Sequence, residues 1–234
     1  MSNFFNPKEW QYKLALAGLK IGAIKINAET PFVWASGYQM PIYNDNRRFL
    51  DFPEHKKMII QYFNAITTAY GIRVNNLAGT STAGIPWAAM LSYFLELPMS
   101  YIRDKPKDHG LRNQIEGLDA ESDYEGIDVI VIEDLISTGG SSAKAVEAAR
   151  KANGNVDHIL SIFNYGFPEA KKLFDDMQPK CEVISLLTYP QLLGVAIKEN
   201  YLKPEQLQIL EEWNSDPFGW GTKHGFPPIP KEQK

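Results

Sequence analysis

The stretch that decides the fold is Val129–Ser142, which reads VIVIEDLISTGGSS. It begins with an unbroken run of β-branched residues, continues with the acids Glu133 and Asp134, and ends in small and hydroxylated residues. A run without polar alternation is typical of a strand covered on both faces, as in parallel sheets. We therefore expect a buried strand that leads through a glycine-rich turn into a helix.

Strand-like and helix-like segments alternate on both sides of this stretch. Such alternation predicts an α/β protein with a central, mostly parallel sheet flanked by helices. The predicted strands are Val74–Ala78, Met99–Ile102, Asp128–Ile132, Ile159–Phe163 and Glu182–Leu187, and the predicted helices are Lys8–Ala23, a helix from Pro53 closed by Gly71, Ile85–Leu95, Ala143–Lys151 and Pro168–Met177.

The length of 234 residues fits a single domain that spans residues 1–234. Roughly residues 1–50 precede the alternation and predict a small N-terminal cap, with short extended pieces at Thr30–Ala35 and Pro41–Tyr43. Residues 214–234 are rich in Pro, Gly and aromatic residues, and we expect an irregular arm there, packed on the surface or on a partner.

Composition narrows the class of protein. The net charge of −4 argues against a general nucleic-acid binder, which is usually basic. The one cysteine, Cys181, excludes an intramolecular disulfide, and no His or Asp pattern marks it as a nucleophile, so we expect a buried thiol. We see neither a signal peptide nor an apolar run long enough to span a membrane, and we expect a cytoplasmic protein without membrane contact.

The turn that follows the predicted strand has the composition of a phosphate site. Gly139 and Gly140 let the backbone direct several N–H groups inward, and the start of the helix adds positive potential. Glu133 and Asp134 would repel a bare phosphate, so they indicate a ligand with hydroxyls or a carbon that becomes cationic, such as ribose 5-phosphate. A plain strand-to-helix turn with a serine cap is the alternative. The hydroxyl donors we expect are Thr138, Ser141 and Ser142.

This segment resembles the signature of type I phosphoribosyltransferases, which bind 5-phosphoribosyl 1-pyrophosphate (PRPP): an apolar strand, two acids, then T-G-G/T-[ST]. The resemblance implies that the turn holds the 5-phosphate. It also implies that Glu133 and Asp134 lie near the ribose hydroxyls and stabilise an oxocarbenium-like transition state. The PRPP-binding residues implied here are Glu133, Asp134, Leu135, Ile136, Ser137, Thr138, Gly139, Gly140 and Ser141.

Arg103–Ser122 has no periodicity and is longer than most connections, which predicts a mobile lid or disorder. The stretch Tyr101–Gly117 reads YIRDKPKDHGLRNQIEG. A solvated charged loop is the alternative. In an extended chain, however, the cations at alternate positions would all face one side, where they would stabilise the charge of a leaving pyrophosphate. The order R-x-K-x-K-x-H-G, then N-Q-I-E-G, resembles the catalytic loop of orotate phosphoribosyltransferases. By that resemblance Arg103, Lys107 and His109 contact the pyrophosphate of PRPP, and the loop reaches the neighbouring subunit of a homodimer. Many members have lysine at the position of Asp104, which leaves Lys105 as a possible substitute.

Phe32–Arg48, FVWASGYQMPIYNDNRR, resembles the segment that lies over the orotate end of the pocket in the same family. Orotate is a planar anion and needs a flat apolar surface with hydrogen-bond donors. The resemblance implies Tyr43 and Arg47 for these roles, with the Ser137 hydroxyl facing the base; plain core packing of the aromatic residues is the alternative. Some members carry a lysine or an arginine where this chain has Ala35 or Asn164-Tyr165, so the contact to the carboxylate stays open.

Leu77–Pro86, LAGTSTAGIP, ends a predicted strand and opens a helix. Gly79, Thr80 and Ser81 are expected to expose backbone donors to a second phosphate, and a capped turn is the alternative. The segment resembles the pyrophosphate loop of the family, with Ala83 where many members have lysine.

The resemblance as a whole implies conversion of orotate and PRPP to orotidine 5′-monophosphate and pyrophosphate, in the synthesis of UMP. The catalytic residues it implies are Lys107, Arg103, His109, Glu133 and Asp134. We expect Mg²⁺ to arrive with PRPP, because no protein-only metal cage is evident. The alternatives are a transferase for another base, a non-catalytic nucleotide-binding regulator on the same fold, and an enzyme inactivated by its departures from the motifs.

Overall fold

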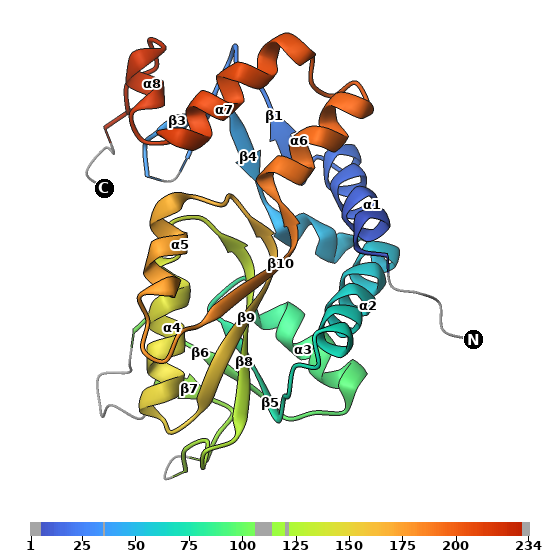
Figure 1. The fold of residues 1–234 in the computed structure, drawn as a ribbon, viewed down its shortest axis with the longest axis vertical. Helices are drawn as coiled ribbons and strands as arrows, with labels where there is room; N and C mark the ends of the chain where they lie inside the picture. Colours follow the sequence, from blue (N-terminus) through green and yellow to red (C-terminus); the bar gives the residue numbers. More distant parts are fainter. Residues whose placement is uncertain (1–5, 35, 106–113, 120–121, 231–234) are drawn as a thin grey trace.

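A computed structural model describes residues 6–34, 36–105, 114–119 and 122–230 of the chain. Its centre is a six-stranded sheet in the order β10-β9-β8-β5-β6-β7 (Figure 1). All neighbours are parallel except β6 and β7, which are antiparallel, so the predicted α/β fold with a mostly parallel sheet is confirmed. The strands are β5 Asn76–Thr80, β6 Met99–Ile102, β7 Ile115–Glu116, β8 Asp128–Ile136, β9 Asn155–Asn164 and β10 Glu182–Thr188.

Helices cover both faces of the sheet, and each face has its own apolar core (Figure 1). Along β8, Val129 and Val131 face one core whereas Ile130 and Ile132 face the other, as the two-residue period of a strand requires. This explains why the decisive stretch shows no polar alternation. On one face lie α1 Pro7–Lys20, α2 Pro53–Ala69 and α3 Ile85–Leu95, and on the other α4 Gly140–Lys151 and α5 Pro168–Asp175.

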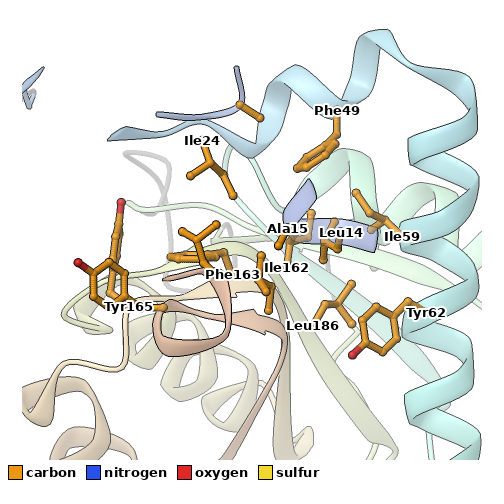
Figure 2. Packing of buried hydrophobic residues seen from close by; sticks show 14 of the residues in the cluster. Leu14, Ala15, Ile24, Phe49, Ile59, Tyr62, Ile162, Phe163, Tyr165 and Leu186 are labelled. Atoms are coloured by element: carbon orange, nitrogen blue, oxygen red, sulfur yellow. The ribbon is translucent and has the colours of Figure 1, made fainter. Parts of the chain in front are cut away.

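The small elements of residues 24–34 and 36–51, here called the cap, gather with the C-terminal helices at one end of the sheet (Figure 1). Figure 2 shows how the cap joins the core: Ile24 and Phe49 of the cap lie near Leu14 of α1 and Phe163 of β9. The cap contains two antiparallel pairs and a 3-10 helix. Its elements are β1 Ile24–Ile26 with β4 Ile42–Asn44, β2 Phe32–Val33 with β3 Gln39–Met40, and η1 Asn46–Asp51; the C-terminal elements are α6 Tyr189–Lys198, η3 Pro204–Gln206, α7 Leu207–Ser215 and α8 Trp220–Lys223.

Three features differ from the sequence expectations. Helices α6 and α7 were not predicted, although Thr188 and Gln191 form a capping box at the start of α6 that was a readable signal. The expected irregular arm contains the short helix α8. Strand β8 runs on to Ile136, past both acids, because it stays paired with β9 up to Asn164.

Cys181 is buried, as predicted, and burial raises the pKa of its thiol to about 12. Across the described ranges, none of the helices combines the length and apolar character that a bilayer crossing requires.

Candidate active site

Glu133 and Asp134 lie near the end of β8, at the carboxyl edge of the parallel strands, where open α/β sheets bind ligands. The Glu133 side chain is buried, and both of its carboxylate oxygens accept hydrogen bonds from the protein. Oε1 accepts from the backbone N–H of Asp134 (3.0 Å), and Oε2 accepts from the Ser142 hydroxyl (3.0 Å). Glu133 therefore ties the end of β8 to the first turn of α4.

Asp134 is partly buried and has a strongly perturbed carboxyl group. Burial raises the pKa of Asp134 to about 8, and the neighbouring charge and hydrogen bond of Glu133 add to the shift. The positive charge of Arg47 acts in the opposite direction. Because a shifted carboxyl group at a ligand-binding edge is typical of a functional site, Asp134 is the strongest candidate among the described acids.

The glycine-rich turn has the backbone that a phosphate site requires. Gly139 adopts a left-handed conformation with φ of 79°, and α4 begins at Gly140. Thr138 and Ser141 are exposed beside the positive end of α4, as expected for phosphate donors. Ser142 was also expected to donate to a phosphate; that expectation was wrong, because its buried hydroxyl donates to Glu133.

The expected pyrophosphate loop follows β5, the strand next to β8, but its donors differ from the prediction. Gly79 lies inside β5, in register with β6 and β8, and the N–H of Ser81 donates to the carbonyl oxygen of Ile102 (2.8 Å). Thr80 is buried, and its hydroxyl donates to the carbonyl oxygen of Ile132 (3.2 Å). The expectation that these residues expose backbone donors was wrong for Gly79 and Ser81, because β5 and its sheet bonding continue further than predicted.

The segment that was expected to form a lid begins and ends in a β-hairpin stem that the sequence did not reveal, since β7 has only two residues. Tyr101 pairs with Glu116, and the N–H of Arg103 donates to the carbonyl oxygen of Gln114 (2.8 Å). The Arg103 guanidinium forms an ion pair with Glu116 (Nη1–Oε1 3.2 Å). Arg103 thus leaves the carboxyl end of β6, at the same edge as the acids. The predicted residues Lys107 and His109 lie outside the described residues.

Tyr43 and Arg47 reach the same region from the cap. The Arg47 guanidinium pairs with Asp45 through both carboxylate oxygens (2.6 and 3.1 Å), and its side chain is 63% exposed. Asp45 raises the pKa of Arg47, with smaller contributions from the charges of Tyr43 and Asp134. Arg47 therefore lies within electrostatic range of both Tyr43 and Asp134.

The residues that join the cap to this edge were missed. Asn46, which is 1% exposed, donates to the backbone carbonyl of Asp134 (2.7 Å). The Trp34 ring packs against Tyr165 (5.5 Å between centroids), and the N–H of Tyr165 donates to the carbonyl of Ile136. Trp34 was weighed as a plain core residue, and no local pattern marks Asn46. Among the described residues, no group of three or more His, Cys, Asp or Glu side chains is arranged to hold a metal ion.

Comparisons with known proteins point to one family. The model of the phosphoribosyl transferase domain family matches residues 47–178. The orotate phosphoribosyltransferase of Listeria monocytogenes is 45% identical over 204 residues, which cover 87% of this chain and 94% of that protein. The enzyme of the same name from Cytophaga hutchinsonii is 41% identical, covering 89% of this chain and 97% of that protein.

A solved structure points the same way. The crystal structure of orotate phosphoribosyltransferase from Aeropyrum pernix superposes with a TM-score of 0.66 at 28% identity, covering 81% of this chain and 99% of that chain. The family model spans more than half of the sequence, and relatives above 40% identity align over most of their length. The chain belongs to the orotate phosphoribosyltransferase family of phosphoribosyltransferases.

Proposed function

We propose that this protein transfers ribose 5-phosphate from PRPP to orotate, which yields orotidine 5′-monophosphate and pyrophosphate in pyrimidine synthesis. The observation that carries the proposal is that Asp134 lies on β8 just before the glycine-rich turn that begins α4, and within electrostatic range of the cap residue Arg47. A sugar phosphate requires both the glycine-rich turn and the Asp134 carboxyl group. A planar anionic base requires the positive charge of Arg47.

Each described part of this edge has a role in that reaction. The turn Ser137–Ser141 and the N-terminus of α4 bind the 5-phosphate through N–H groups, hydroxyls and the helix dipole. The Asp134 carboxylate lies beside the ribose and stabilises positive charge that develops as pyrophosphate leaves. Glu133 orients Asp134, since its own oxygens accept bonds from Asp134 and Ser142. Tyr43, Arg47 and the Ser137 hydroxyl bind orotate.

The lid completes the site when it closes. Arg103, Lys107 and His109 bind the pyrophosphate, and closure excludes water from a reactive cationic sugar. The hairpin stem made by β6 and β7 supports this role, because it places both ends of the lid on the same side of the sheet as the carboxyl ends of β5 and β8. Asp104 and Ala83 are compatible with activity in this proposal, since Lys105 and Arg103 remain on the lid.

Mg²⁺ is proposed as the cofactor. The described residues offer Asp134 as a carboxylate that fits such a cation, but no cage of three acidic or histidine ligands. PRPP oxygens would therefore supply most of its ligands, and the bound ion would neutralise charge on the leaving pyrophosphate. A nearby cation would also favour the ionised form of Asp134.

We propose further that the protein is a cytoplasmic homodimer in which the lid serves the neighbouring site. The groove between α2 and α3 supports this: Ile60 and Met90 line it, and Tyr93 and Phe94 at its margin are 88% and 49% exposed. Large exposed apolar side chains of this kind mark interaction surfaces. Light scattering on the purified protein should give twice the mass of the chain, and Tyr93→Glu should give the monomer.

The direct test is PRPP-dependent consumption of orotate with Mg²⁺, alongside uracil, adenine and hypoxanthine. Of these four bases, we expect only orotate to be consumed. Lys107→Ala should lower kcat about a hundredfold or more, as loss of a transition-state contact does, whereas the control Lys151→Ala on the exposed face of α4 should keep parent activity. Turnover of another base would overturn the choice of substrate, nucleotide binding without turnover would favour the regulator, and an unchanged rate in Lys107→Ala would remove the lid from the mechanism.

A further inference from the structure

The C-terminal arm, defined as residues 216–230, packs on the hairpin formed by β2 and β3, here called the Trp34 hairpin. The backbone N–H of Ile229 donates to the carbonyl oxygen of Gly37 (2.9 Å), and the Gln39 side-chain amide donates to the carbonyl oxygen of Pro227 (2.8 Å). The rings of Tyr38 and Phe218 meet edge to face at 5.1 Å. Figure 1 shows β3 and α8 side by side at the far end of the cap.

The backbones of the C-terminal arm and the Trp34 hairpin pack so closely that two of their positions have no room for a side chain. A Cβ atom on Gly37 would lie 2.4 Å from the carbonyl oxygen of Ile229. A Cβ atom on Gly221 of the arm would lie 2.5 Å from the oxygen of Phe226 and 3.1 Å from that of Gln39. The arm also has its own packing, since Trp220 is 2% exposed and stacks on His224. The two backbones therefore meet in one defined arrangement.

The Trp34 hairpin depends on outside contacts for its shape. It has two residue pairs, Phe32 with Met40 and Val33 with Gln39. A lone two-stranded hairpin is marginally stable in water at best. Helix α7 holds its inner side, where the Trp213 ring meets Trp34 at 6.1 Å and its N–H donates to the Met40 sulfur (3.0 Å). The C-terminal arm contacts the tip of the hairpin, at Gly37 and Tyr38.

The hairpin in turn contacts both sides of the base end. The Trp34 side-chain N–H donates to the carbonyl oxygen of Ile42 (2.8 Å), the residue before Tyr43. The Trp34 ring packs on Tyr165, whose N–H donates to Ile136, the residue before Ser137. A shift of the hairpin would therefore reach Tyr43 and Ser137.

The extent of the family match separates this contact from the PRPP machinery. The match covers residues 47–178, which include the lid, the acids and the glycine-rich turn. The Trp34 hairpin and the arm both lie outside it. Their contact therefore lies outside the part of the chain that holds the glycine-rich turn and the two acids.

We propose that the C-terminal arm is a positioning element for the base site, which holds the Trp34 hairpin in place so that Tyr43 and Ser137 bind orotate. The inference rests on the proposed function, in which these residues contact orotate. It assigns the arm no contact with either substrate. Its loss should weaken orotate binding and leave the steps that involve PRPP unchanged.

Ile229→Pro tests this, because proline lacks the N–H that donates to Gly37 and is compatible with the neighbouring prolines at 228 and 230. The matched control Ile229→Ala keeps the N–H and trims a side chain that is 48% exposed. We expect Ile229→Pro to raise KM for orotate about fivefold, as loss of one hydrogen bond does, with kcat and KM for PRPP as in the parent and the melting temperature lowered by at most a few degrees. The control should match the parent throughout.

Hydrogen exchange without substrates gives a second readout. Amides of residues 36–40 should exchange faster in Ile229→Pro than in Ile229→Ala. An unchanged KM for orotate in Ile229→Pro overturns the inference, and so does an equal rise in KM for both substrates. Failure of the proposed function is distinct, because the unmodified chain would then turn over no orotate.

Discussion

The side-chain amide of Asn46 donates a 2.7 Å hydrogen bond to the backbone carbonyl oxygen of Asp134, 88 positions further along the chain. Asn46 opens η1 in the cap, and Asp134 lies near the end of β8. The bond joins the proposed base end of the site to the proposed sugar end. Buried hydrogen bonds of this kind have large effects when one partner is removed, because the other is left without a partner.

Asn46→Ala should lower the free energy of unfolding by about 1–3 kcal/mol, since the Asp134 carbonyl loses a buried donor. Urea denaturation measures this. The control is Asn27→Ala, where the lost asparagine is exposed and caps a surface turn through the N–H groups of Glu29 and Thr30. We expect a smaller loss there. Equal losses in the two variants would contradict the role assigned to Asn46.

The two glycines of the turn should respond differently to alanine. A Cβ atom on Gly139 would lie 2.7 Å from the ring of Phe174, and the φ of 79° strains any other residue, whereas a Cβ atom on Gly140 meets nothing within 4 Å. Gly139→Ala should cost about 1–3 kcal/mol of stability. Gly140→Ala should keep parent stability but raise KM for PRPP, because its methyl group enters the proposed phosphate site. Thermal melting and steady-state kinetics on both variants check this, and equal stability would contradict it.

Alanine variants of Ser141 and Ser142 should separate an effect on PRPP binding from an effect on the free energy of unfolding. Ser142→Ala leaves Oε2 of the buried Glu133 without its donor, which should cost about 1–3 kcal/mol in urea denaturation. Ser141 is exposed, so Ser141→Ala should leave stability unchanged and raise KM for PRPP. If Ser142→Ala melted like the parent, Glu133 would not be the link between β8 and α4.

Asp134 should make stability depend on pH. Its carboxyl pKa is raised from 3.8 in the unfolded chain to about 8, so the folded protein binds this proton more tightly. The contribution of Asp134 to the free energy of unfolding therefore falls as pH rises between about 4 and 8 and is level above that range. Asp134→Asn should show a shallower fall between pH 5 and 8 in urea denaturation.

The control for this experiment is Asp51→Asn, which changes an exposed carboxyl in the cap. That variant should keep the slope of the parent. Parallel curves for Asp134→Asn and the parent would show that Asp134 titrates alike in the folded and unfolded states. The Asp134 slope should also weaken when PRPP and Mg²⁺ are present, because a bound cation stabilises the carboxylate.

Much of the fold was predictable because it depends on local pattern. The β-branched run before Glu133, the helical spacing of Ile85–Leu95 and the extended Met99–Ile102 all appear where expected. The two-residue strand β7 was not predictable, because it gains its strand geometry from pairing with β6. The positions of Arg103, Asp134 and the turn at one sheet edge followed from the rule that parallel strands end together.

Thus the sequence by itself determined the buried strand, the acid pair and the glycine-rich turn, because an unbroken β-branched run favours a buried strand and consecutive glycines permit a tight turn. Tertiary structure alone decided the hydrogen-bond partners. In the folded protein the Glu133 oxygens accept from the Asp134 N–H and the Ser142 hydroxyl, and the Ser81 N–H donates to the carbonyl oxygen of Ile102. It also brings Asn46 to Asp134 and Ile229 to Gly37. A hydrogen bond takes the partner that lies within about 3 Å in the right direction, and only packing of distant segments sets which partner that is.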